Sequence, residues 1–314
     1  MKNPSRRTFL KMVGVGGAVL AAGAVAGPVA ASEGMKINND NMAMLYDATR
    51  CVGCKACMTT CKRVNLDSGS LAYEKAEFDQ DGLWDAPDDL SGDTRTLIKL
   101  YKESPTKWSY VKHSCMHCQK PSCVSVCPVS AMTRDPESGI VTYDKTICIG
   151  CRYCQVACAF NIPRFQWDKA IPQIVKCDMC KSTVLPKTGT TGCAGVCPVD
   201  AIHFGKRGDL LAEGQRRLAA QPEKYIQYIY GAHELGGLDH LYLAGLPFEK
   251  LGLPIVGDQP PAAFSEKIQH TIYKGFIAPV ALYGSLCYVA IKNMKQGASK
   301  DGHDDSKEQK GGDA

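Results

Sequence analysis

Cysteine dominates the residues of this chain that could do chemistry. Sixteen of the seventeen cysteines fall into four groups of four, in which consecutive thiols are separated by two to four residues apart from one gap of twelve. Thiolates at such spacings bind metal ions or iron–sulfur clusters. The groups are Cys51, Cys54, Cys57 and Cys61; Cys115, Cys118, Cys123 and Cys127; Cys148, Cys151, Cys154 and Cys158; and Cys177, Cys180, Cys193 and Cys197.

The spacing separates the chemistries that use so much sulfur. A structural zinc site needs two cysteine pairs with a longer loop between them, and only the fourth group has that form. The first and third groups have the compact Cys-x2-Cys-x2-Cys-x3-Cys run of bacterial ferredoxins, in which three thiolates bind one [4Fe-4S] cluster and the fourth binds the other cluster of the pair. Disulfides are an alternative for an exported domain, although disulfide frameworks rarely place four cysteines within eleven residues twice. The pattern therefore predicts four [4Fe-4S] clusters, with Cys287 as a packing residue in an apolar segment.

The elements that must position these thiols repeat along the chain. Cys127-Pro128-Val129-Ser130-Ala131 is echoed by Cys197-Pro198-Val199-Asp200-Ala201, and each run is followed by a short β-like stretch, at 140–143 and at 202–204. We expect an α+β fold of two interlocked bacterial-ferredoxin-like modules, rich in loops. Closeness in sequence favours one module from the second and third groups and another from the first and fourth, but a module from the third and fourth groups is also geometrically possible.

The charge balance and the absence of other motifs exclude several classes of protein. The formal net charge is +5, from 37 basic and 32 acidic residues, but four of the cations lie in an N-terminal export segment, and without them the balance is 33 to 32. The remaining chain has no basic stretch with which to bind nucleic acid. It also has no nucleophile–base pair, dinucleotide glycine fingerprint or phosphate loop, so we expect no catalytic residue in this chain.

Both ends of the chain carry targeting or membrane signals. Residues 1–31 have the form of a twin-arginine signal peptide, with Arg6-Arg7, a glycine- and alanine-rich apolar run, and small residues before an expected cut after Ala31. Near the other end, 275–291 holds no charged residue and is flanked by lysines, which predicts one transmembrane helix in contact with lipid, within an anchor at 266–296. A buried helix of a soluble core is the alternative. We expect a single-pass protein on the periplasmic face of the cytoplasmic membrane, with a disordered cytoplasmic tail at 297–314.

Between these segments, 32–265 is expected to form the four-cluster domain, with an insert at 67–112. The insert is rich in aspartate and glycine, so its charged residues are expected to form a solvated excursion or a partner contact. His117 lies between two cysteines and could replace a thiolate, but the full cysteine set favours a surface or hydrogen-bonding role. His270, at the start of the anchor, is expected to cap or to lie at the interface and not to bind quinone.

Several motifs resemble one known family. They are the signal Ser5-Arg6-Arg7, the segment Met44-Leu45-Tyr46-Asp47, the runs Cys51-Val52-Gly53-Cys54 and Cys148-Ile149-Gly150-Cys151-Arg152-Tyr153-Cys154, and Ile268-Gln269-His270-Thr271-Ile272-Tyr273-Lys274-Gly275. Over essentially the whole chain they resemble the four-cluster electron-transfer subunits of membrane-bound respiratory oxidoreductases. Within that family, the resemblance is greatest to the iron–sulfur subunit of nickel-iron hydrogenase-2.

The resemblance implies which thiols share a cluster. In that family the first and fourth groups interlock, as do the second and third. The implied ligand sets are Cys51, Cys54, Cys57 and Cys197 for cluster A; Cys61, Cys177, Cys180 and Cys193 for cluster B; Cys115, Cys118, Cys123 and Cys158 for cluster C; and Cys127, Cys148, Cys151 and Cys154 for cluster D.

The resemblance also implies a function. Electrons from hydrogen oxidation by the small and large subunits of a nickel-iron hydrogenase would pass through the four clusters to an integral membrane subunit that reduces quinone. The relay subunit of a formate dehydrogenase or another molybdopterin oxidoreductase is the alternative. The export signal argues against it, because such subunits are commonly carried across the membrane by a signalled catalytic partner. A non-redox binding protein with structural clusters is an alternative of another class.

Overall fold

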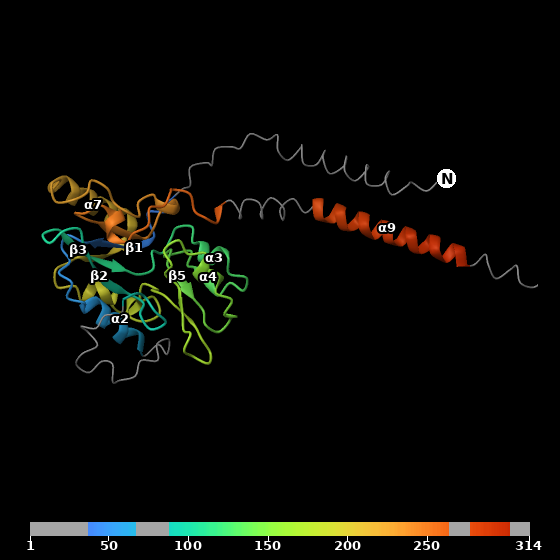
Figure 1. Cartoon of the computed structure of the whole chain (residues 1–314), viewed down its shortest axis with the longest axis horizontal. Helices are drawn as coiled ribbons and strands as arrows, with labels where there is room; N and C mark the ends of the chain where they lie inside the picture. The colour runs from blue at the N-terminus through green and yellow to red at the C-terminus, as the bar shows by residue number, and fades with distance from the viewer. Residues whose placement is uncertain (1–36, 67–87, 264–276, 302–314) are drawn as a thin grey trace, which may run out of the picture. The chain divides into compact units, whose positions relative to one another are not determined.

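The computed structural model describes residues 37–66, 88–263 and 277–301 (Figure 1). The predicted signal peptide at 1–31, the first part of the insert at 67–87, the start of the anchor with His270, and the tail from 302 lie outside these residues. The elements are β1 (Met42–Asp47), α2 (Ala56–Leu66), β2 (Leu97–Lys102), β3 (Trp108–His113), α3 (Ser122–Ser125), β4 (Met132–Arg134), β5 (Val141–Tyr143), α4 (Tyr153–Val156), β6 (Arg164–Phe165), β7 (Ile174–Val175), α5 (Leu185–Thr188), α6 (Gly192–Gly195), β8 (Ile202–Lys206), α7 (Arg207–Ala220), the 3-10 turns at Glu234–Gly236 and Phe248–Leu251, β9 (His240–Leu243) and α9 (Ile277–Asp301). Helices and strands are mixed along the chain, as the α+β prediction requires.

A three-stranded sheet joins two distant parts of the chain. Strand β1 pairs with β8 in antiparallel fashion and with β9 in parallel fashion. Its side chains alternate between two cores: Met44 and Tyr46 face the core that contains the cysteines, while Ala43 and Leu45 face a smaller core under α7. Figure 1 shows α7 lying over β1. Because both faces are covered, β1 is apolar at consecutive positions, where a half-exposed strand would alternate apolar and polar residues.

This sheet brings the first and fourth cysteine groups into one module. Strand β1 leads into the first group, which continues into α2, and β8 follows directly after the fourth group, which includes α6. Helices α2 and α6 are in contact, where Gly192 leaves room for the side chain of Thr60. A Cβ at Gly192 would lie 3.1 Å from that side chain, so the small residue permits the close approach.

The second and third cysteine groups form the other module. Strands β4 and β5 pair in an antiparallel hairpin, β6 pairs with β7, and α3 contacts α4. In Figure 1 the labels α3, α4 and β5 lie together. The module has a small core of its own, made of Met132, Val141, Cys154, Phe165 and Ile174.

The second half of the predicted insert is not a solvated excursion. Strands β2 and β3 form an antiparallel hairpin, in which Leu97 pairs with His113 and Ile98 with Lys112. The side chains of Leu97, Ile98, Val111 and Lys112 are buried. The prediction was wrong here because the aspartate- and glycine-rich composition of the whole insert obscured two strands whose apolar side chains complete the core of the first module.

A 25-residue helix, α9, occupies the predicted anchor and runs past 296 to Asp301. Its apolar side chains Val280, Leu282, Leu286, Val289 and Ile291 are exposed. The structure does not confirm a transmembrane helix, because none of the helices within the described residues combines the length and the apolarity needed to cross a membrane.

Candidate metal centres

Four thiols from the first and fourth groups surround one cavity, which we call site A. Cys51 and Cys54 come from the turn between β1 and α2, Cys57 from the first turn of α2, and Cys197 from the turn after α6. The cavity has a volume of about 320 Å³, and Tyr46 contributes to its otherwise largely apolar wall. The antiparallel pairing of β1 with β8 brings Cys51 and Cys197 to the same end of the strand pair, since Cys51 follows the last residues of β1 and Cys197 precedes the first residues of β8.

A second cavity of about 320 Å³, site B, is lined by Cys61, Cys177, Cys180 and Cys193. The first of these thiols is the last of the first group, and the other three belong to the fourth. Three charged side chains, Lys112, Arg95 and Asp178, also line this cavity. Sites A and B thus draw on the same two cysteine groups in an interleaved way.

The remaining eight thiols gather in the second module, as the sets predicted for clusters C and D, which we call sites C and D. The pKa of the Cys118 thiol is raised well above its ordinary value, first by burial and then by the neighbouring thiolates Cys115, Cys158 and Cys123. At site D, the pKa of Cys154 is raised to about 11, first by burial and then by its neighbours Cys148, Cys151 and Cys127. Cys118 and Cys154 therefore each have the other three members of their predicted set as neighbours.

Burial gives the thiols of Cys57, Cys61 and Cys177 a strong preference for the protonated state, through a raised pKa. It raises the pKa of Cys57 and of Cys177 to about 12, and the pKa of Cys61 well above its ordinary value. For Cys61 the nearby thiols Cys177, Cys193 and Cys180 add to the effect. Protonated thiols must lose their protons to bind iron, so metal binding at these sites releases protons.

Backbone N–H groups point at the sulfur atoms. The amides of Gly53, Met179 and Ala201 donate to the sulfurs of Cys51, Cys177 and Cys197 at 3.5, 3.4 and 3.2 Å. Such donors stabilise thiolate ligands and anionic groups bound by them.

The compact cysteine runs need a left-handed residue at their first glycine. Gly53 has a φ of +70° and Gly150 a φ of +71°, and the amide of Gly150 donates to the sulfur of Cys148 at 3.4 Å. At Gly53, an added Cβ would overlap the ring of Tyr110. Glycine therefore allows the chain to turn tightly enough for successive thiols to face one centre.

All seventeen cysteines are free thiols. Within the described residues, no three side chains of His, Cys, Asp or Glu converge closely enough to hold a single metal ion. The thiols of sites A and B instead stand around a cavity. This donor set, four cysteines around each cavity with amide donors to sulfur, fits a [4Fe-4S] cluster.

The sites neighbour one another in the order A, B, C, D. Cys57 of site A is a close charged neighbour of Cys193 of site B, and Cys123 of site C has the same relation to Cys154 of site D. Tyr242 lies between the modules: it is fully buried and within electrostatic range of Cys177 at site B and Cys115 at site C.

His117 is a buried hydrogen-bonding residue and does not lie on the surface. Its Nδ1 accepts the backbone N–H of Val141 at 3.1 Å, and burial holds the pKa of the imidazole well below its ordinary value. The neutral ring therefore carries its proton on Nε2, which has no partner within the described residues. A buried donor without a partner fits an acceptor that is bound beside site C.

Sequence reasoning missed two buried lysines. Lys112 lies in the wall of site B, and Lys176 is a neighbour of Cys123 at site C, where its ammonium donates to the backbone carbonyls of Val141 and Cys177. The aromatic and β-branched residues of Trp108–His113 are typical of a strand, but they do not show that a lysine in that strand faces inward.

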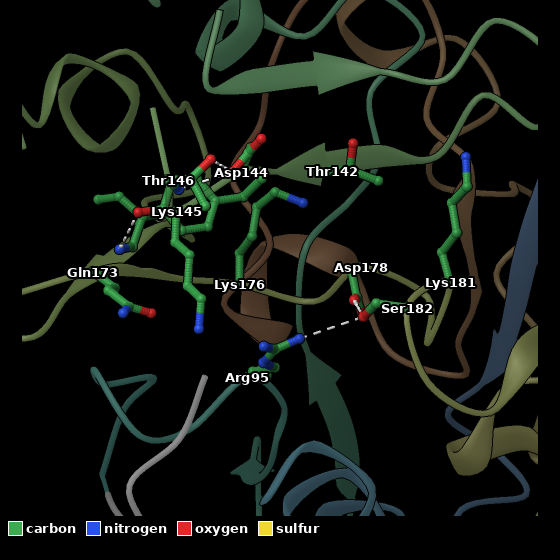
Figure 2. Close-up of a pocket in the computed structure, with 12 residues that line it drawn as sticks. Arg95, Thr142, Asp144, Lys145, Thr146, Gln173, Lys176, Asp178, Lys181 and Ser182 are labelled. Carbon is green, nitrogen blue, oxygen red and sulfur yellow. Dashed lines mark hydrogen bonds and ion pairs between the residues drawn. The ribbon is translucent and has the colours of Figure 1, made fainter. Parts of the chain in front are cut away.

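A larger open pocket of about 1270 Å³ adjoins site B (Figure 2). Figure 2 shows Arg95 and Asp178 facing each other in its wall, with an ion pair of 3.4 Å between them, and both residues also line the site B cavity. Lys145, Lys176 and Lys181 contribute the other cations. This pocket brings solvent to within one layer of side chains of site B.

Comparison with known proteins supports iron–sulfur centres in this chain. Residues 106–207 match the family model of the 4Fe-4S dicluster domain. The chain is 37% identical to the Hydrogenase-2 operon protein HybA of Shigella flexneri, over 96% of this chain and 99% of that protein. The chain belongs to the HybA family. More distant members of the wider group are the iron-sulfur subunit of the nitrate-inducible formate dehydrogenase of Shigella flexneri, 30% identical over 79% of this chain and 82% of that protein, and Protein NrfC of Escherichia coli, 34% identical over 69% and 87%.

Proposed function

We propose that this HybA homologue is the electron-transfer subunit of a respiratory hydrogenase. In this role it relays electrons through four [4Fe-4S] clusters, from a periplasmic nickel-iron hydrogenase to a membrane subunit that reduces quinone. The proposal is supported by the spacing of sixteen cysteines in four groups, in a chain 37% identical over nearly its full length to a hydrogenase-2 operon protein.

The proposed ligands are the four sets of sites A to D. When bound, [4Fe-4S] clusters accept and donate single electrons without a change in their ligands. The chain's own residues bury the thiols, donate amide hydrogens to sulfur and exclude water from the cavities. The succession A, B, C, D supports a row of electron carriers with an end in each module.

An exposed apolar surface at site D supports docking of one partner there. Ile149, Tyr153 and Val156 stand in and around the third cysteine group, and Val156 is 86% exposed. Trp167, 68% exposed, lies under the guanidinium of Arg152 at 4.7 Å from the ring centroid. Exposed aromatic and aliphatic side chains with an arginine are typical of the centre of a protein–protein interface. The hydrogenase and the quinone-reducing subunit are the two proposed partners, at opposite ends of the row.

We also propose that the chain is exported by its twin-arginine signal and held at the periplasmic face of the membrane through α9. The exposed apolar side chains of α9 support attachment to lipid. Alkaline washing of membranes tests this: a chain released by carbonate, or one found in the cytoplasm with residues 1–31 intact, contradicts it.

Metal analysis of the complex tests the relay function. Material purified anaerobically from gently solubilised membranes should contain about sixteen irons and sixteen acid-labile sulfides per chain, and reversible paramagnetic signals on reduction. It should also contain a nickel subunit. A molybdenum subunit in its place favours the formate dehydrogenase alternative, which the 30% identity to such a subunit motivates. Clusters that show no reversible signal support the non-redox alternative.

A further inference from the structure

Lys112 is a buried charged residue that lies beside the thiols of site B. It lies in β3 opposite Ile98, and its side chain is fully buried. Lysine is almost never fully buried unless its ammonium is paired, because removing the charge from water is costly.

The ammonium of Lys112 has no carboxylate counterion within the part of the chain that the structure describes. Its Nζ donates to Oγ of Ser114 at 2.9 Å. Since an ammonium only donates, the Ser114 oxygen is the acceptor, and the Ser114 hydroxyl can donate in turn to Nδ1 of His240 at 3.2 Å. Ser114 and His240 are themselves fully buried. This chain of neutral groups orients the ammonium and leaves its charge uncompensated.

The missing countercharge is provided by sulfur. Lys112 lines the cavity of site B together with its four thiols. Thiolates that bind a cluster in this cavity would place negative charge beside the buried ammonium. Lys112 in turn lowers the pKa of Cys57 and of Cys177 against the effect of burial.

Two further contacts hold Lys112 in place. The hydroxyl of Tyr242 donates to the backbone carbonyl of Lys112 at 2.8 Å, and six residue pairs hold its strand against β2. The position of the charge is therefore fixed with respect to site B and to Cys57 of site A. A fixed charge in a dry interior acts strongly on a neighbouring redox group, since water does not screen it.

We propose that Lys112 is the positioning residue whose fixed positive charge raises the reduction potential of the cluster at site B and, to a smaller extent, at site A. The proposal rests on the proposed function, in which these thiols bind [4Fe-4S] clusters. Reduction adds one electron and one negative charge to the group held by the four thiolates. The nearby ammonium stabilises the more negative state, so electrons reside at site B more readily than the buried, anionic ligand set alone would allow.

The test is a redox titration followed by electron paramagnetic resonance, on the complete complex purified anaerobically. Lys112→Met keeps the length and apolar volume of the side chain and removes its charge, whereas Lys112→Arg keeps the charge. The matched control is Lys102→Met, which removes an exposed lysine from the same hairpin. In Lys112→Met we expect one couple to become at least tenfold harder to reduce, a fall of 59 mV for one electron. A second couple should fall by less, and Lys112→Arg and Lys102→Met should leave every couple near its original potential.

The possible outcomes distinguish a failure of the proposed role of Lys112 from a failure of the proposed relay function. Unchanged potentials in a Lys112→Met complex with full iron content overturn the role of Lys112 alone. If Lys112→Met loses iron, retention of iron by Lys112→Arg supports a requirement for the charge, and loss in both variants overturns it in favour of packing. A wild-type complex without reversible signals overturns the relay function and this proposal together.

Discussion

Removal of single thiols tests whether the ligand sets are interleaved. Cys51 and Cys197 line the same cavity although they belong to different cysteine groups, whereas Cys61, the last thiol of the first group, lines the other cavity with Cys177. Each cavity has four thiols, so loss of one thiol should affect one cluster of four. We expect Cys51→Ala and Cys197→Ala each to lower the iron content by up to about four atoms of about sixteen, and to abolish the same paramagnetic signal.

The decisive comparison is with the last thiol of the first group. Cys61→Ala should lower the iron content equally but abolish a different signal, the one that Cys177→Ala also removes. The assays are iron and acid-labile sulfide per chain, and the spectrum of the dithionite-reduced complex. Cys287→Ala is the control, because Cys287 lies in α9 outside the four sets, and it should retain every signal. If Cys51→Ala and Cys61→Ala remove one common signal and Cys197→Ala another, each group binds its own cluster and our reading of the cavities is refuted.

Three further predictions concern the frame around the sites. Asp47→Asn weakens a charge-assisted bond that Arg217 donates at 2.9 Å to a buried carboxylate, which should lower the stability by about 1.5–3 kcal/mol and the thermal midpoint by several degrees in circular dichroism; an unchanged midpoint contradicts this. Gly53→Ala places a side chain against the ring of Tyr110 at a φ of +70°, so it should selectively lose the site A signal, and full retention of iron would show that the turn relaxes freely. Burial lowers the pKa of His113 to about 4, so below about pH 6.5 the unfolded chain binds a proton at this residue that the folded chain does not bind. The stability of the folded protein should therefore fall as the pH drops from 6.5 toward 4, and it should fall less in His113→Gln. Thermal midpoints of both proteins at pH 7 and pH 5 would show this difference.

The cysteine spacing predicted the chemistry of the centres, but not how the groups pair. Spacing along the chain left a module of the third and fourth groups open, because the choice depends on contacts between residues far apart in sequence. The pairing of Met44 with Phe204 in β1 and β8 is such a contact. No periodicity within either strand specifies its partner, since both strands are short and β1 is buried on both faces.

Composition was a poor guide to the insert and to the buried charges. The strands at Leu97–Lys102 and Trp108–His113 are rich in aliphatic and aromatic residues, but they lie beside a long aspartate- and glycine-rich stretch that dominates the average composition. Lys112 is charged and therefore reads as exposed in any scale of hydrophobicity. Its burial follows from thiolates contributed by residues far away in sequence, and that information is present only in the folded chain.

The pairing of β1 with β8 also governs when each half of the molecule can mature. On the ribosome, every thiol of sites C and D has been synthesised by Cys158, while site A waits for Cys197 and site B for Cys193. The early-emerging Cys51, Cys54 and Cys57 must remain unoccupied and reduced throughout that delay. Nascent chains released before Cys193 would therefore carry at most the centres at sites C and D. The pairing of β1 with β8, which completes sites A and B, has to wait until β8 (Ile202–Lys206) has been synthesised.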